Sequence, residues 1–127
     1  MQNLLFVGLG GALGSMARYL VGVHSFRAFG PGWPYGTLIV NVVGGLLMGV
    51  LVSWLAHRGG VDQERWRLLL GVGALGGFTT FSAYSLELAL MIEKRAYVAA
   101  SAYGAASVGL SVVALFAGLI LARRLFA

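Results

Sequence analysis

The sequence predicts an all-α membrane protein with four transmembrane helices, the third of them broken near its middle. Of the 127 residues, 59% are hydrophobic and only 10% are charged, and the mean hydropathy of +0.87 is far too high for a soluble domain. The apolar residues form four runs, each long enough to cross about 30 Å of hydrocarbon at about 1.5 Å per residue. The third run contains a stretch rich in glycine and threonine, which a continuous helix explains poorly.

The four predicted spans make the chain a single membrane domain, and they lie at residues 4–23, 36–56, 66–92 and 97–122. The polar residues 24–34 suit an interfacial loop, and Asp62 is expected to cap a helix that begins near Gln63. The chain has no cysteine, which excludes disulfides and thiolate metal sites. Its basic residues lie singly or in pairs at the ends of the apolar runs, so we expect them to anchor helices in a lipid bilayer rather than to bind nucleic acid.

The first span carries one cation on a face of small residues. Gly10, Gly14 and Arg18 follow one another at intervals of four and therefore share a helix face. One interpretation is a packing face whose arginine extends to the membrane surface. The other is a cation that lines the access route of an anion, and the spacing leaves both open.

The second span has an asparagine deep in its apolar run. Thr37, Asn41, Gly45 and Gly49 recur every four residues and form one stripe without a bulky apolar side chain. A buried amide must find hydrogen-bond partners in hydrocarbon. Asn41 is therefore either a bond between helices or part of a hydrated path, and the threonine on the same stripe favours the path.

The third span contains the residues that organise the rest of the chain. Residues 71–85, GVGALGGFTTFSAYS, combine glycines, hydroxyl side chains and aromatic rings within one apolar run. Glycine inside a helix costs about 1 kcal/mol relative to alanine, and unwound backbone persists in a bilayer only where protein buries it or where it lines a hydrated space. We expect a broken helix near residues 76–80 at a functional centre, although glycines that only permit close helix packing are an alternative.

The fourth span carries Tyr103, Ser107 and Ser111 at intervals of four, so they form one polar stripe. The charge distribution along the chain bears on orientation. With a cytoplasmic amino terminus, five basic residues lie inside and four outside, so the positive-inside bias is nearly absent. The five are Arg58, Arg65, Arg67, Arg123 and Arg124, and the four are Arg18, Arg27, Lys94 and Arg95. Such a chain is expected to insert in both orientations and to form an antiparallel homodimer, because four short helices are too few to enclose a pathway.

These motifs together resemble the CrcB/Fluc family of fluoride channels. The resemblance rests on the GxxGGxTTFS run at residues 73–82, the GTLxVN run at residues 36–41, the arginine late in the first span and the polar stripe of the fourth span. It covers essentially the whole chain, with matching order and spacing of the spans. It implies a passive fluoride channel of the bacterial inner membrane, built as a dual-topology homodimer with two narrow pores.

The resemblance also implies roles for individual residues. Matching by position, Phe81 and Tyr84 take the places of the family's paired pore phenylalanines, Asn41 of its pore asparagine, Ser107 and Ser111 of its polar track, and Arg18 of its vestibule cation. Tyr84 departs from the family's usual phenylalanine.

The same resemblance implies a structural Na⁺ at the two-fold centre of the dimer, held by the main-chain carbonyls of Gly76 and Thr79. Carbonyl oxygens freed at a helix break are hard ligands that suit such a cation.

The chemistry of the residues agrees with an anion channel. Fluoride is small and strongly hydrated, so a dehydrating pore must replace its water with hydroxyls, amide N–H groups and the positive rims of aromatic rings. Thr37, Tyr103 and the stripes described above provide such donors, which chloride or water could also use.

Two alternatives are a small dual-topology, proton-coupled exporter that uses Glu87 and an assembly subunit that conducts nothing. The sequence offers no support for an enzyme, because no nucleophile–base pair or metal set is present.

Overall fold

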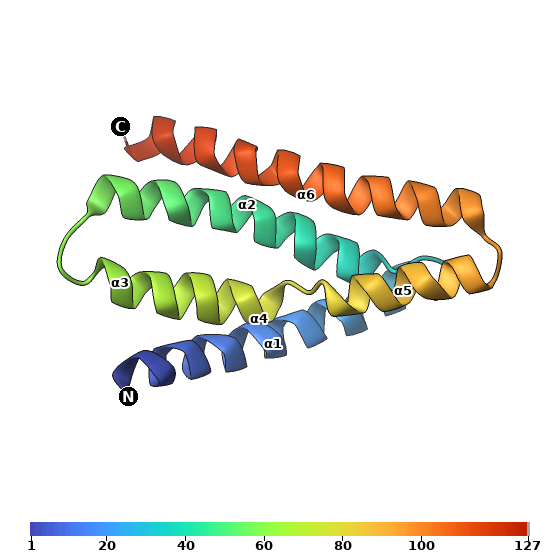
Figure 1. Cartoon of the computed structure of the whole chain (residues 1–127), viewed down its shortest axis with the longest axis horizontal. Helices are drawn as coiled ribbons and strands as arrows, with labels where there is room; N and C mark the ends of the chain where they lie inside the picture. Colours follow the sequence, from blue (N-terminus) through green and yellow to red (C-terminus); the bar gives the residue numbers. More distant parts are fainter. Residues whose placement is uncertain (127) are drawn as a thin grey trace.

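A computed structural model describes residues 1–126, which form helices joined by short connections (Figure 1). Four stretches are long and apolar enough to cross a membrane, namely Gln2–Phe29, Tyr35–Arg58, Gln63–Glu93 and Tyr97–Phe126. The all-helical, four-span prediction is therefore confirmed. The elements are α1 (Gln2–Phe29), α2 (Tyr35–Arg58), α3 (Gln63–Trp66), the π-helix η1 (Arg67–Leu75), α4 (Gly76–Phe78), α5 (Ser82–Glu93) and α6 (Tyr97–Phe126).

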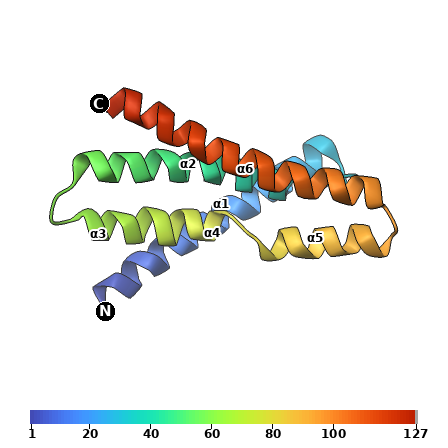
Figure 2. The ribbon, with the colours of Figure 1, turned by 45° about the horizontal axis from the view of Figure 1, so that its top comes forward.

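The connections gather at the two ends of the bundle. Both termini and the turn at residues 59–62 lie at one end, and the connections at residues 30–34 and 94–96 lie at the other (Figure 1). Helix α1 crosses the remaining helices obliquely, and α5 is displaced from the line of α3 and α4 (Figure 2). The third span is thus two rods that are offset at the break.

Helices α2 and α6 pack closely because small residues face each other. A Cβ atom on Gly49 would collide with the carbonyl of Leu115, and one on Gly118 would collide with that of Leu46. Ser53 adds a hydrogen bond across this contact, its Oγ donating to the Leu119 carbonyl at 3.1 Å. Backbone approach at small residues is the usual basis of helix association in lipid, where apolar burial gives little driving force.

The face of α1 that carries Gly10 and Gly14 packs against η1, which agrees with the first of the two interpretations, a packing face. A Cβ atom on Gly10 would collide with the Leu69 carbonyl, and one on Gly14 would collide with that of Ala74. Both contacts lie along η1 and its end. The nine-residue π-helix was not foreseen from the sequence, although π segments often accompany functional sites.

The predicted break in the third span is present, but it begins three residues later than expected. Gly76 has φ of −61° and starts the short helix α4, whereas Thr79 has φ of −85° and ψ of 160° and is extended. The backbone N–H and the Oγ1 of Thr79 both donate to the Leu75 carbonyl, at 3.0 and 2.9 Å. These two bonds close the last helical turn at Thr79, so the chain is extended after the glycine pair rather than within it.

Two expectations about the connections need correction. The loop predicted at residues 24–34 is shorter, because α1 continues to Phe29 and ends at Gly30, whose φ of 76° favours glycine. The helix after the second connection does begin at Gln63, but Asp62 makes no side-chain cap. Its carboxylate instead accepts two hydrogen bonds from Arg58, at 2.8 and 2.9 Å, and one from Trp66.

Candidate functional site

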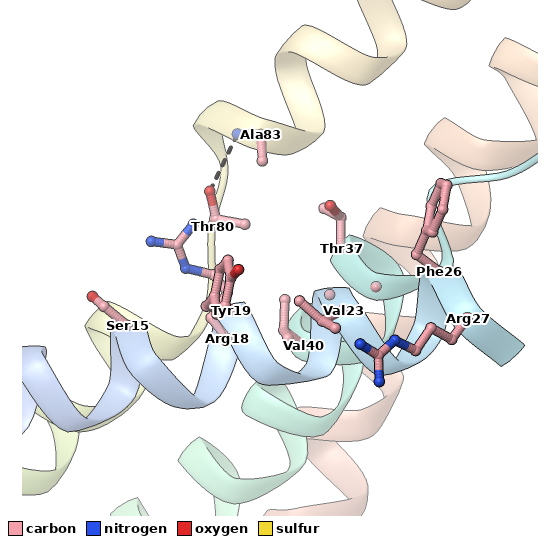
Figure 3. A pocket seen from close by; sticks show the side chains of 12 residues that line it. Ser15, Arg18, Tyr19, Val23, Phe26, Arg27, Thr37, Val40, Thr80 and Ala83 are labelled. Atoms are coloured by element: carbon pink, nitrogen blue, oxygen red, sulfur yellow. Dashed lines mark hydrogen bonds between the residues drawn. The ribbon is translucent and has the colours of Figure 1, made fainter. Parts of the chain in front are cut away.

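Asn41 of α2 holds the break in the third span. Its Nδ2 donates to the Thr80 carbonyl at 2.9 Å, and its Oδ1 accepts the Thr80 backbone N–H at 2.8 Å. The Oγ1 of Thr80 in turn accepts the backbone N–H of Ala83 at 3.2 Å, at the start of α5 (Figure 3). One amide thus replaces the helical partners of Thr80 and satisfies both of its main-chain groups.

Several carbonyls at the break remain without a hydrogen bond. Nothing within residues 1–126 donates to the carbonyls of Gly76, Phe78 and Thr79, whereas the Gly77 carbonyl accepts the Nε of Arg18 at 3.0 Å. Neutral carbonyl oxygens suit a hard monovalent cation better than a divalent one, because no carboxylate is present to balance a second charge. In the part of the chain described, no cluster of three His, Cys, Asp or Glu residues offers an alternative metal site.

A cavity between α2, α5 and α6 joins most of the predicted pore residues. Ser107 is only 5% exposed, and the hydroxyls of Ser107 and Ser111 have no hydrogen-bond partner among the described residues. A serine in a membrane helix normally bonds to a carbonyl of its own helix. Leaving a buried hydroxyl unpaired costs about 1–3 kcal/mol, so both groups are available to a bound species. The cavity lining includes Asn41, Thr79, Thr80, Phe81, Tyr84, Ser107 and Ser111.

Aromatic rings border the same cavity. Phe81, at the end of the break, is 75% exposed, and its ring centroid lies 5.3 Å from that of the buried Tyr84. Tyr84 lies 5.5 Å from Tyr103, which is fully buried. The rim of an aromatic ring is positive and its face is negative, so rings beside hydroxyl groups can contribute to the binding of an anion through their edges.

The sequence interpretation missed a pair of hydrogen bonds at Glu87. Thr37 Oγ1 donates to one carboxylate oxygen at 2.7 Å, and Tyr103 OH donates to the other at 2.8 Å. Thr37 and Tyr103 were both predicted as pore residues, whereas Glu87 was considered only for an exporter. An acid within a membrane span must find donors, and this requirement was the signal that could have linked the three residues.

Arg18 lies in a second cavity, between α1, α2 and the break. Figure 3 shows Arg18 and Thr80 towards one end of this cavity and Phe26 and Arg27 towards the other. Arg18 uses its Nε on the Gly77 carbonyl and forms no ion pair within the described chain. The arginine therefore both holds the break and contributes positive charge to a cavity, so the structure leaves both interpretations of Arg18 possible.

The predicted site residues thus fall into three connected groups. Asn41, Phe81, Tyr84, Ser107 and Ser111 share one cavity. Thr37 and Tyr103 meet at Glu87, and Thr37 also lines the cavity that contains Arg18. Gly76 starts the short helix before the break and Thr79 lies at the break, where its side chain contacts Gly44 of α2.

Comparison with known proteins gives consistent matches along the chain. The sequence profile of the family described as CrcB-like protein, Camphor Resistance (CrcB), matches residues 5–119. A protein of Phenylobacterium zucineum is 70% identical over 100% of both chains, and one of Cereibacter sphaeroides is 53% identical over 96% of this chain and 95% of its own. A protein of Caulobacter vibrioides is 67% identical over 100% of both chains. All three carry the name fluoride-specific ion channel FluC, which describes a channel and not an enzyme.

Proposed function

The chain belongs to the CrcB family, and from this premise we propose that it is a fluoride-selective channel that releases fluoride across a bacterial inner membrane by passive conduction. The names of its relatives support the choice of ion. The observation that carries the proposal is the pair of unpartnered hydroxyls on Ser107 and Ser111, which lie in one cavity with Phe81 and Tyr84. Buried donors without partners are costly unless a ligand or water uses them.

The order of the donors suggests a path along the third and fourth spans. Thr37 and Tyr103 donate to Glu87, and the ring of Tyr103 is followed by that of Tyr84. The hydroxyls of Ser107 and Ser111 continue along α6 beside Phe81. A dehydrated fluoride would meet an unpartnered hydroxyl at Ser107 and Ser111 and an aromatic ring at Phe81 and Tyr84, which together replace part of its hydration shell.

The surface of one protomer around Phe81 is exposed within a membrane span, which favours an antiparallel homodimer. Phe81 is 75% exposed, and Ser85 is also exposed on α5 within a membrane span, whereas the exposed Ser82 bonds to Thr80 through its hydroxyl at 3.3 Å. Hydrocarbon does not satisfy such hydroxyl groups, whereas a second copy could cover them. With the nearly even basic charge of the two ends, an antiparallel pair with two equivalent pores follows. A cysteine in place of the exposed Val61 should then be labelled from both sides of the membrane.

A structural Na⁺ at the dimer centre would be held by the break. The carbonyls of Gly76 and Thr79 receive no hydrogen bond from the residues that follow them, and their chemistry suits a hard cation. When bound, Na⁺ would neutralise carbonyl dipoles that hydrocarbon leaves unpaired. The chain itself contributes the extended Thr79 backbone and the fixed position of Thr80, which Asn41 secures.

The proton-coupled exporter is not favoured. Its proton carrier would be Glu87, whose two carboxylate oxygens each accept a hydroxyl hydrogen bond. Both oxygens are thus already bonded within the bundle, and the named relatives are channels.

The test is ion efflux from liposomes that contain the purified protein. We expect rapid fluoride efflux, retention of chloride and no dependence on an imposed proton gradient. Equal leakage of both anions, or no fluoride efflux, would contradict a fluoride-selective channel. A rate that follows the proton gradient would instead support the exporter.

A further inference from the structure

A third cavity opens at the end of the bundle that carries the connections at residues 30–34 and 94–96 (Figure 1). It lies between α1, the first of these connections, the end of α5 and the start of α6. The polar and aromatic residues in its lining include Ser25, Trp33, Thr37, Glu87 and Lys94. Thr37 and Glu87 connect this cavity directly to the hydroxyl groups of the proposed path.

Trp33 lines the cavity and its ring contacts that of Tyr103. The two rings meet edge-on, with centroids 5.7 Å apart and an angle of 82° between their planes. Tyr103 is fully buried, and its hydroxyl donates to Glu87 at 2.8 Å. The indole thus covers the phenol ring while the Tyr103 hydroxyl reaches the carboxylate that lines the cavity.

Lys94 is the one cation in the described lining of this cavity, which also contains the carboxylate of Glu87. Lys94 follows the last residue of α5, is exposed, and forms no ion pair within residues 1–126. Of the three basic residues near this end of the bundle, Arg27 lines the Arg18 cavity and Arg95 lines neither cavity. A cation at a helix carboxyl terminus also stabilises the helix, so this second role must be separated by experiment.

We propose that this cavity is the aqueous antechamber of the anion path and that Lys94 offsets the Glu87 carboxylate and draws small anions into the cavity. The inference rests on the proposed channel function and adds a route into it together with a residue that sets the arrival rate. A cation beside a narrow opening with protein walls raises the local concentration of anions. The effect is electrostatic and must weaken as salt shortens the screening length, from about 30 Å at about 10 mM to about 3 Å at about 1 M.

The first experiment measures initial fluoride efflux at low fluoride concentration, where arrival of the ion limits the rate. The ionic strength is set with an impermeant salt at about 10 mM and about 1 M. We expect Lys94→Gln to be about two- to five-fold slower than wild type at low ionic strength and equal to it at high ionic strength. Lys94→Arg keeps the charge and should retain the wild-type rate, and the neighbouring Arg95→Gln should lose less than Lys94→Gln.

Three outcomes are distinguished by this design. A Lys94→Gln rate equal to wild type at low salt would overturn the inference, and so would a loss that is the same at both ionic strengths, since that is the signature of a helix-stabilising role. Absence of fluoride efflux from the wild-type protein would contradict the proposed function itself. Wild-type efflux with an unaffected Lys94→Gln variant leaves the channel intact and removes only the antechamber.

A second experiment sets the charge after folding, so that a folding defect cannot explain the result. The chain contains no cysteine, and Lys94→Cys therefore introduces a unique thiol. A positively charged methanethiosulfonate reagent should raise fluoride efflux at low ionic strength, and a negatively charged one should lower it. Equal efflux after both reagents would show that the charge at this position does not act on the ion.

Discussion

Two sets of polar groups lie at membrane depth in this chain, and they differ in how they are bonded. At the break, the Asn41 amide is bonded on both sides to the backbone of Thr80. On α6, the hydroxyls of Ser107 and Ser111 are buried and have no partner in the described chain. The first set is committed to the fold, and the second is free to bind. The two sets therefore differ in their state of bonding, which their residue types alone do not reveal.

The sequence placed both sets in one class, as donors of a hydrated path. Asn41 lines the same cavity as the two serines. Its role as a pore residue stays a prediction. Its two hydrogen bonds to the Thr80 backbone stabilise the break. A path that includes Asn41 would have to use the remaining hydrogen of its amide, since one N–H is occupied by the Thr80 carbonyl.

The largest effect is expected at Phe81, which belongs to neither set. Its ring is exposed, lines the cavity of the unpartnered hydroxyls and contacts the ring of Tyr84. Phe81→Ile should abolish fluoride efflux because the positive ring edge is lost, while the proposed dimer remains intact by size-exclusion chromatography. Wild-type efflux in this variant would refute its role in the pore.

Asn41→Asp is expected to have a smaller effect than Phe81→Ile, and it should change both the stability of the protein and its fluoride efflux. The carboxylate would keep the acceptor for the Thr80 N–H but would lose the donor and face the Thr80 carbonyl. The protein should lose about 1–3 kcal/mol of stability as well as most of its fluoride efflux. Thermal unfolding and efflux are measured on the same preparation. Lost efflux with unchanged stability would mean that Asn41 acts on the ion and not on the break.

A substitution next to the break is expected to leave the helices of one protomer intact but to weaken the proposed dimer. Gly76 has a helical φ of −61°, and an added Cβ would meet only the Gly71 carbonyl, at 3.6 Å, so a side chain there causes no backbone strain. Gly76→Val should therefore leave helix content unchanged by circular dichroism and weaken dimerisation and Na⁺ binding.

The matched variant Thr79→Ser keeps the hydrogen bond to Leu75 and should assemble almost as wild type. Normal dimers and Na⁺ dependence in Gly76→Val would place the cation elsewhere.

The smallest effect is expected at Asp62, in the turn outside the spans. Hydrogen bonds from Arg58, with a further one from Trp66, lower the pKa of Asp62 from 3.8 to about 2. A lowered pKa means that the interaction stabilises the turn above about pH 3.8 and is lost as the pH falls through about 2. Asp62→Asn should remove this acid transition from tryptophan fluorescence and leave efflux at neutral pH unchanged. A transition that persists in this variant would belong to another group.

Much of the fold follows from local rules that the sequence displays. Span number, the broken third helix and the start of a helix at Gln63 are set by apolar run length and by turn and breaker residues, which act over a few positions. The π-helix and the exact site of the break were not foreseen. They depend on contacts with α1 and on the bonds of Thr79 to Leu75, and such pairings are invisible in the order of residues.

The sequence predicted residues that lie near the candidate site, but it did not predict the hydrogen bonds between them. Stripes at intervals of four group Asn41 with Thr37 and Ser107 with Ser111, and the structure places Asn41, Ser107 and Ser111 in one cavity. Which hydroxyl meets which acceptor depends on how the helices cross, and this is why the bonds at Glu87 were missed.

The most direct measurement is fluoride efflux together with thermal stability for the double variant Ser107→Ala, Ser111→Ala. If the unpartnered hydroxyls exist for the ion, efflux should fall by at least about ten-fold, equivalent to about 1.4 kcal/mol, while the midpoint of unfolding stays at or above that of wild type. The reason is that the change removes buried donors which satisfy nothing within the described chain. Wild-type efflux with lowered stability would contradict the account, because the hydroxyls would then serve the fold.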